Sequence, residues 1–202
     1  MAIDRKRIIE SMSKITVENN RDGIIPAFNV FVNRLPSYFW NSFSERLTRR
    51  VGDEMLEAAE YLLIDAARTC GYHTGYGIIT SEEWKAVVEP MIEKRPDDIL
   101  YGAFAVFTAW GWAKSEVVEL VAGQRLVVRA YDYYESDVVS YGACKKPSAY
   151  MIRGVCAAFM GLAYGGEYSK TDMAKVRMFD CEQTKGIECG DDYGEFVVTL
   201  AK

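Results

Sequence analysis

The sequence contains a single histidine, His73, and no uninterrupted apolar run approaching the roughly 20 residues that cross a bilayer. Its five cysteines form no recognisable framework, and their odd number argues against a disulfide-stapled secreted fold. The N-terminal residues lead into no signal-peptide core, so we expect a soluble protein of the reducing cytoplasm. A net charge of −5 also leaves the chain without the clustered positive charge of a nucleic-acid binder.

Large, soft side chains are abundant instead: 13 tyrosines, 9 phenylalanines, 4 tryptophans and 8 methionines. Such residues fill protein cores, and they also line pockets for flat apolar ligands. At 202 residues, with 26% of them charged, the chain has an ordinary globular composition. We expect an N-terminal helical extension over residues 1–25 and a single ligand-binding domain over residues 26–202.

The hydrophobic period changes near residue 105. Before residue 105, apolar residues recur at three- and four-residue steps, which predicts helices. The first covers residues 4–18, the second begins at about Pro36, and the third covers 53–70 and is ended by Gly71. A fourth begins at a capping box at 80–83. After residue 105, the pattern predicts a hairpin of strands 112–121 and 125–134, a helix from Pro147 to about Tyr164, and strands at 173–183 and 194–201. Strict alternation would place Tyr131 and Tyr133 on the face opposite Ala130. This order predicts an α+β fold, with helices packed on one face of an antiparallel sheet.

The second half carries three motifs: Tyr-Tyr-Glu-Ser at 133–136, Tyr-Gly-Ala-Cys-Lys-Lys-Pro-Ser at 141–148 before a helix at 150–161, and a strand-turn-strand at 181–196. Together, over about residues 110–200, they resemble the core of 4-vinyl reductase type (hydrocarbon-binding) domains. The resemblance implies a fold shared with Golgi transport-particle subunits and phenol-sensor domains, an apolar cavity between helices and sheet, and a homodimer. Gly186 and Gly194 stand where that family commonly has cysteines, which puts any metal role of this hairpin in doubt.

The aromatic residues and one arginine provide the candidate ligand site. A pocket for a small apolar or aromatic molecule would be built from Tyr38, Phe39, Phe43, Trp84, Phe104, Trp110, Trp112, Tyr131, Tyr133, Tyr150, Arg153 and Phe159. Arg153 interrupts the apolar part of the helix that follows Pro147. It could orient a ligand carboxylate, or it could simply pair with Glu135 or Asp137. The first functional hypothesis is therefore a sensor or carrier that needs no cofactor.

The alternative is a small hydrolase that depends on Cys144 or His73. Cys144 lies beside two lysines and ahead of a helix, a setting in which thiols become reactive, but no accompanying base is visible. His73 follows the long predicted helix, where it could act as a general base or as a local cap. Cys181 and Cys189 are a weak alternative for metal ligands, because their spacing is unlike that of a zinc knuckle. The Gly75-Tyr-Gly77 pattern lacks the strand-turn-helix context of a nucleotide loop, so we predict no cofactor.

Overall fold

The computed structural model describes residues 3–33 and 35–201. Its α-helices are α1 (Arg5–Met12), α2 (Ser37–Arg50), α3 (Asp53–Ile79), α4 (Glu82–Val87), α5 (Asp97–Ala109), α6 (Val138–Tyr141), α7 (Tyr150–Tyr164) and α8 (Met173–Val176). Its strands are β1 (Ile25–Ala27), β2 (Val30–Val32), β3 (Ala113–Val121), β4 (Arg125–Tyr133), β5 (Phe179–Lys185) and β6 (Gly194–Leu200). Short 3₁₀ turns are η1 (Glu89–Met91), η2 (Tyr134–Ser136) and η3 (Ile187–Cys189).

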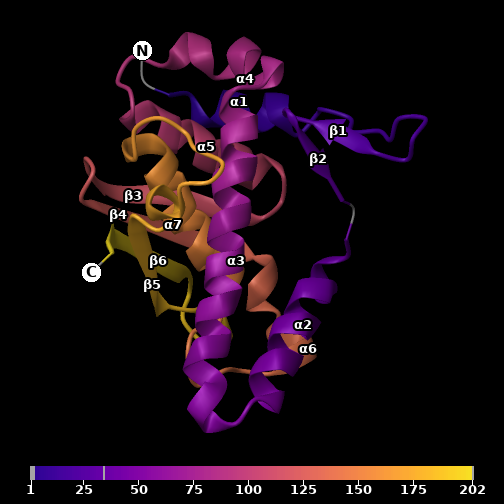
Figure 1. Cartoon of the computed structure of the whole chain (residues 1–202), viewed down its shortest axis with the longest axis vertical. Helices are drawn as coiled ribbons and strands as arrows, with labels where there is room; N and C mark the ends of the chain where they lie inside the picture. The colour runs from indigo at the N-terminus through magenta and orange to yellow at the C-terminus, as the bar shows by residue number, and fades with distance from the viewer. Residues whose placement is uncertain (1–2, 34, 202) are drawn as a thin grey trace.

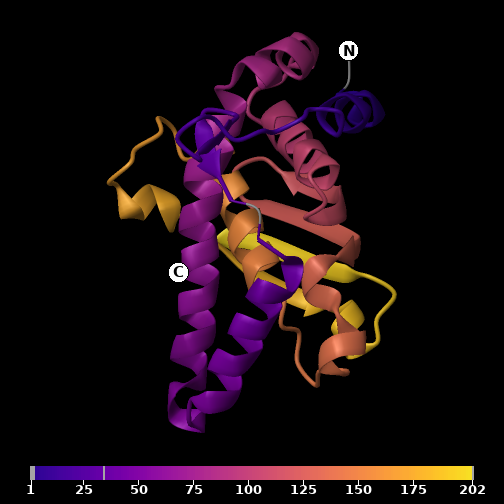
Figure 2. The same ribbon diagram turned by 90° about the vertical axis from the view of Figure 1, so that its right-hand side faces the viewer.

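The predicted α+β class is confirmed. Strands β3, β4, β6 and β5 form, in that order, a four-stranded antiparallel sheet. Helix α7 packs on β5 and β6, and α3 in turn packs along α7, so the helices form layers on one face of the sheet (Figures 1 and 2). The main core lies between these layers, where residues of α5 and α7 meet the inward side chains of β4, β5 and β6. No helix in the described ranges combines the length and apolar character that crossing a bilayer requires.

Helix α3 extends to Ile79, so the predicted end at Cys70 and Gly71 is wrong. Two glycines that would favour termination, Gly71 and Gly75, instead permit close packing on α7. A Cβ on Gly71 would lie 3.1 Å from the Cβ of Ala158, and one on Gly75 would lie 2.5 Å from Leu162 Cδ1. These glycines are therefore kept inside the helix by its contact with α7, which a local pattern cannot reveal.

The face of Tyr133 was also predicted wrongly. Ala113 pairs with Tyr133 while Ser115 pairs with Ala130, so β4 holds one extra residue between these pairs. Such a β-bulge reverses the alternation of side chains beyond it. Tyr131 accordingly stays on the outer face, and Tyr133 turns into the core.

The N-terminal segment differs from its prediction in two ways. Helix α1 ends at Met12 rather than near residue 18, and residues 25–32 form an unpredicted hairpin of β1 and β2 (Figure 1). At its turn, Phe28 has a φ of 49°, which is rare for a bulky residue, and its ring is buried 4.3 Å from that of Trp110. The tertiary contact thus compensates for an unfavourable local conformation. The domain boundary near residue 25 stays a prediction.

Candidate functional site

Five aromatic rings form a cluster between α5, α7, the start of β3 and η2. Phe104 and Phe107 on α5 both contact Phe159 on α7, with ring centroids 5.3 and 5.9 Å apart. Trp112 stacks on Phe107 at 5.7 Å and meets Tyr134 edge-on at 5.9 Å. We call this set the aromatic cluster. Three of its members, Phe104, Trp112 and Phe159, were among the predicted ligand residues.

Tyr134 supplies the polar group of the aromatic cluster. Its hydroxyl is buried, and no residue in the described part of the chain hydrogen-bonds to it. Burial raises the pKa of Tyr134 well above its ordinary value, so the hydroxyl keeps its proton and can donate. A buried polar group without a partner is costly, and such groups often mark a place for a ligand or water. Tyr134 was not among the predicted ligand residues, and strand alternation could not have placed it, because it lies in η2 beyond the bulge of β4.

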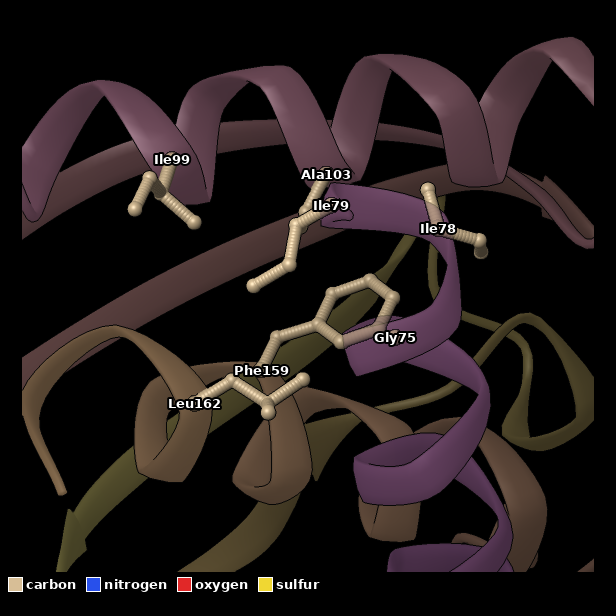
Figure 3. A pocket seen from close by; sticks show the side chains of 7 residues that line it. All are labelled: Gly75, Ile78, Ile79, Ile99, Ala103, Phe159 and Leu162. Atoms are coloured by element: carbon tan, nitrogen blue, oxygen red, sulfur yellow. The ribbon is translucent and has the colours of Figure 1, made fainter. Parts of the chain in front are cut away.

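A small void adjoins the aromatic cluster on the far side of Phe159. Figure 3 shows Ile99 and Ala103 reaching it from α5, and Phe159 and Leu162 from α7. Its remaining lining residues are Gly75, Ile78 and Ile79 of α3. The lining is almost entirely apolar, and the volume is about 10 Å³, close to the minimum for one water molecule. The aromatic cluster therefore has a void beside it, but side chains fill most of the space that a ligand would need.

Four predicted ligand residues lie outside the aromatic cluster, three of them buried and Trp110 partly buried. Trp84 and Trp110 belong to a second core with α1 and α4, where the indole of Trp84 donates to Glu89. The Tyr150 hydroxyl donates to Glu60 Oε1 at 3.0 Å, and burial together with Glu60 raises the pKa of Tyr150. Tyr133 donates to Glu188 Oε2, and burial with that contact raises its pKa. Both tyrosines thus have protein partners for their polar ends.

Four other predicted ligand residues are largely exposed. Tyr38, Phe39 and Phe43 lie on α2 with 63%, 44% and 48% of their surface accessible. Tyr131 lies on the outer face of the sheet, where its ring meets that of Tyr193. The structure therefore does not bring these four side chains to the aromatic cluster.

Arg153 lies away from the aromatic cluster. Its Nε donates to the carbonyl oxygen of Cys181 at 3.0 Å, and its side chain lines a separate groove of about 660 Å³. Among the described residues it forms an ion pair with neither Glu135 nor Asp137. Glu135 instead accepts the backbone N–H groups of Met151 and Ile152 at the start of α7.

The candidate catalytic residues, Cys144 and His73, have different neighbours. Cys144 accepts a weak hydrogen bond from Ser148 Oγ at 3.6 Å, and its backbone N–H donates to the backbone carbonyl of Glu188 at 2.7 Å. His73 Nδ1 lies 2.8 Å from the hydroxyl of Tyr168, in the loop after α7. No hydrogen bond or ring contact joins Cys144 to His73 within residues 3–33 and 35–201, so the structure does not assemble a thiol–imidazole pair from them.

The cysteines suggested as metal ligands are likewise separated by their contacts. Cys181 is buried in contact with Cys156, whose thiol has its pKa raised by burial. Cys189 is partly exposed at η3, and its pKa is raised by burial and by nearby Glu188 and Cys144. The described residues contain no group of three or more histidine, cysteine, aspartate or glutamate side chains that could hold a metal ion.

Comparison with known proteins supports the fold through structure rather than sequence. No protein-family model matches the chain, and no curated protein matches it. The crystal structure of the phenol-responsive sensory domain of the transcription activator PoxR with phenol is similar, with a TM-score of 0.71 and 12% identity over 99% of this chain and 92% of that chain. Subunit 3 of a trafficking protein particle complex from Naegleria fowleri, covalently bound to palmitic acid, has a TM-score of 0.50 and 16% identity over 82% of this chain and 93% of that chain. At these identities, the similarities show a shared fold.

Proposed function

We propose that this chain binds a small apolar or aromatic molecule as a sensor or carrier, and that it is a hydrocarbon-binding domain of the 4-vinyl reductase type. The observation that carries the proposal is the unpartnered Tyr134 hydroxyl within the aromatic cluster. A flat ligand gains free energy by burying apolar surface, at roughly 25 cal/mol per Å². A single ligand hydroxyl would satisfy Tyr134 and fix the orientation of the ring.

The similar folds support this proposal. One of them is a sensory domain that responds to phenol, and the other carries palmitic acid, so both hold a largely apolar molecule. The void beside Phe159 is too small for a phenol, which means that Phe159 and Leu162 must move when the ligand enters. We infer that the unliganded protein is closed around its own aromatic side chains.

Phenol and toluene form the matched pair of ligands that tests the role of Tyr134. We expect Tyr134→Phe to weaken phenol binding by about five- to tenfold while leaving toluene binding unchanged, since one hydrogen bond contributes about 1 kcal/mol. Removing an unpartnered buried hydroxyl should also raise the free energy of unfolding by up to about 1 kcal/mol. Tryptophan fluorescence, to which Trp112 contributes, reports binding, and urea titration reports stability.

Tyr131→Phe is the control, because Tyr131 lies on the outer face of the sheet. This substitution should change the binding of neither phenol nor toluene. If phenol and toluene both fail to bind the natural sequence in the millimolar range, and native mass spectrometry finds no co-purifying small molecule, the proposed function is wrong.

We further propose that the chain acts in the cytoplasm as a homodimer. The exposed apolar side chains of α2 support this, together with Met55 and Leu62 on the neighbouring helix α3, which are 54% and 62% exposed. A cluster of exposed apolar side chains on a soluble protein commonly marks an interface. The connected ends of the two helices project from the body (Figure 2), which leaves exposed apolar side chains there to pack against a second copy.

A further inference from the structure

The groove that contains Arg153 is larger than the void beside Phe159, and the two share no lining residue. It runs between the first half of α3, the loop before α7, and β5 at the edge of the sheet. Its volume of about 660 Å³ falls in the usual range of small-molecule sites. Leu56, Tyr61 and Ile64 of α3 give it one apolar wall.

The charged side chains of this groove are of both signs and incompletely paired. Glu60 already binds Lys146 Nζ at 2.5 Å and the Tyr150 hydroxyl at 3.0 Å. Arg153 is held in place by its Nε, which donates to the Cys181 carbonyl, and it forms no ion pair with any described carboxylate. Glu182 follows Cys181 directly, lines the same groove, and likewise forms no ion pair within the described ranges. The groove thus presents a guanidinium that is held through its Nε, and a lining carboxylate, Glu182, that forms no ion pair in the described part of the chain.

Strand addition by a peptide is an unfavourable use of this groove. Strand β5 lies at the sheet edge, where an incoming strand would need free carbonyl groups. Two of these carbonyls already accept side-chain donors: Cys181 from Arg153, and Lys185 from Gln183 Nε2 at 3.1 Å. Side chains therefore occupy part of the edge, which favours a compact ligand over an extended chain.

We propose that the groove binds a small zwitterion of the apolar α-amino-acid class. The ligand carboxylate would take the terminal nitrogens of Arg153, whose planar fork matches a carboxylate. The ammonium group would lie against Glu182, with Glu57 adding negative charge on the α3 side. The side chain would pack on Leu56, Tyr61 and Ile64. A simple anion would meet excess carboxylates, because Asp53, Glu57 and Glu182 outnumber Arg153 once Glu60 has paired with Lys146.

Three probes separate the charge requirements: L-phenylalanine, 3-phenylpropionate, which lacks the ammonium group, and 2-phenylethylamine, which lacks the carboxylate. We expect titration calorimetry to show binding of L-phenylalanine, with each analogue weaker by about tenfold or more. Arg153→Gln and Glu182→Gln should each weaken the binding of L-phenylalanine by about tenfold. Glu182→Gln changes an exposed side chain that forms no ion pair with any described residue, so it keeps the test meaningful if Arg153→Gln fails to fold.

Arg129→Gln is the matched control, because Arg129 pairs with Glu195 on the other side of the sheet from α7. It should leave binding unchanged. The proposal is overturned if either analogue binds as tightly as L-phenylalanine, or if neither groove variant weakens binding. It is also overturned if L-phenylalanine, L-leucine and L-methionine all fail to bind in the millimolar range. Phenol binding at the aromatic cluster should be unaffected by Glu182→Gln, so the two sites can fail independently.

Discussion

Glu135 is a carboxyl group that caps a helix to which it does not belong. Helix α7 begins after Ala149, whose side chain cannot cap it, and Glu135 in η2 accepts the N–H groups of Met151 and Ile152 at 3.0 and 2.9 Å. Burial raises the pKa of Glu135 to about 8, against the lowering effect of these two hydrogen bonds. Glu188 raises it further, while Arg153 lowers it. At neutral pH the folded protein therefore keeps a proton on Glu135 that the unfolded chain has already lost.

This proton predicts a pH dependence of stability. Because the folded pKa lies above the unfolded value of 4.5, stability from this group is fully present below about pH 4.5 and is lost as pH rises through about 8. The slope for one proton is at most about 1.4 kcal/mol per pH unit. We expect Glu135→Gln to flatten the fall in unfolding free energy between pH 5 and 8, measured by urea titration. Glu182→Gln should keep the natural slope; equal slopes in both variants would contradict this explanation.

Phe159 belongs to the aromatic cluster and also lines the void. Its truncation to alanine should therefore enlarge the void into a cavity joined to the cluster. Phe159→Ala should lower the free energy of unfolding by about 3–5 kcal/mol, as for other buried phenylalanines. Benzene at saturation should restore part of this loss, because an apolar cavity of ring size can bind it. Thermal unfolding with and without benzene measures both effects. The natural sequence is the comparison, and a benzene effect no greater in the variant would argue against a joined cavity.

At the scale of elements, the contact between α3 and α7 depends on residues without side chains. A Cβ on Gly154 would lie 2.5 Å from both the Ala67 Cβ and the Ile64 carbonyl oxygen. Backbone atoms cannot move aside as a flexible side chain can, so the two helices would have to separate.

Gly154→Ala should therefore lower the unfolding free energy by about 1–3 kcal/mol, despite the better helix propensity of alanine. Gly161→Ala in the same helix is the control, because its nearest neighbour would be 3.3 Å away. Circular dichroism during urea unfolding gives both values. A loss in Gly161→Ala as large as that in Gly154→Ala would show that packing on α3 is not the cause.

The elements that sequence patterns predicted well are those whose signal is local. The β3–β4 hairpin was predicted from its Val- and Tyr-rich strands, and the Ser81 side chain caps α4 by accepting from the Trp84 N–H, one residue beyond the start of the proposed capping box. Helix α7 begins at Tyr150 rather than Pro147, because residues 144–148 are held by Glu188 instead. The bulge beside Tyr133 and the glycines of α3 depend on tertiary contacts. The same holds for the candidate site. The sequence shows that aromatic residues are abundant, but which of their rings contact one another depends on the tertiary structure.

For the whole molecule, the projecting α2–α3 hairpin predicts self-association. Phe39→Ser combined with Leu62→Ser should shift the mass measured by light scattering from dimer to monomer while leaving the circular dichroism spectrum unchanged, since both residues are already exposed. Val139→Ser, at a residue that is 99% exposed on α6, is the control. A natural protein that is monomeric at all concentrations tested would refute the proposed dimer.

The small size of the void beside Phe159 also affects how the protein would respond to its ligand. Under the proposed function, the conformation that accepts a ligand is a minor fraction of the population, and the observed affinity falls in proportion to that fraction. Each tenfold reduction of the open population requires a tenfold higher ligand concentration for the same occupancy. The detection threshold would then be set by how tightly Leu162, Ile79 and their neighbours pack, as well as by the groups that touch the ligand. Variation in these apolar residues could tune the response of related chains without altering which molecule they recognise.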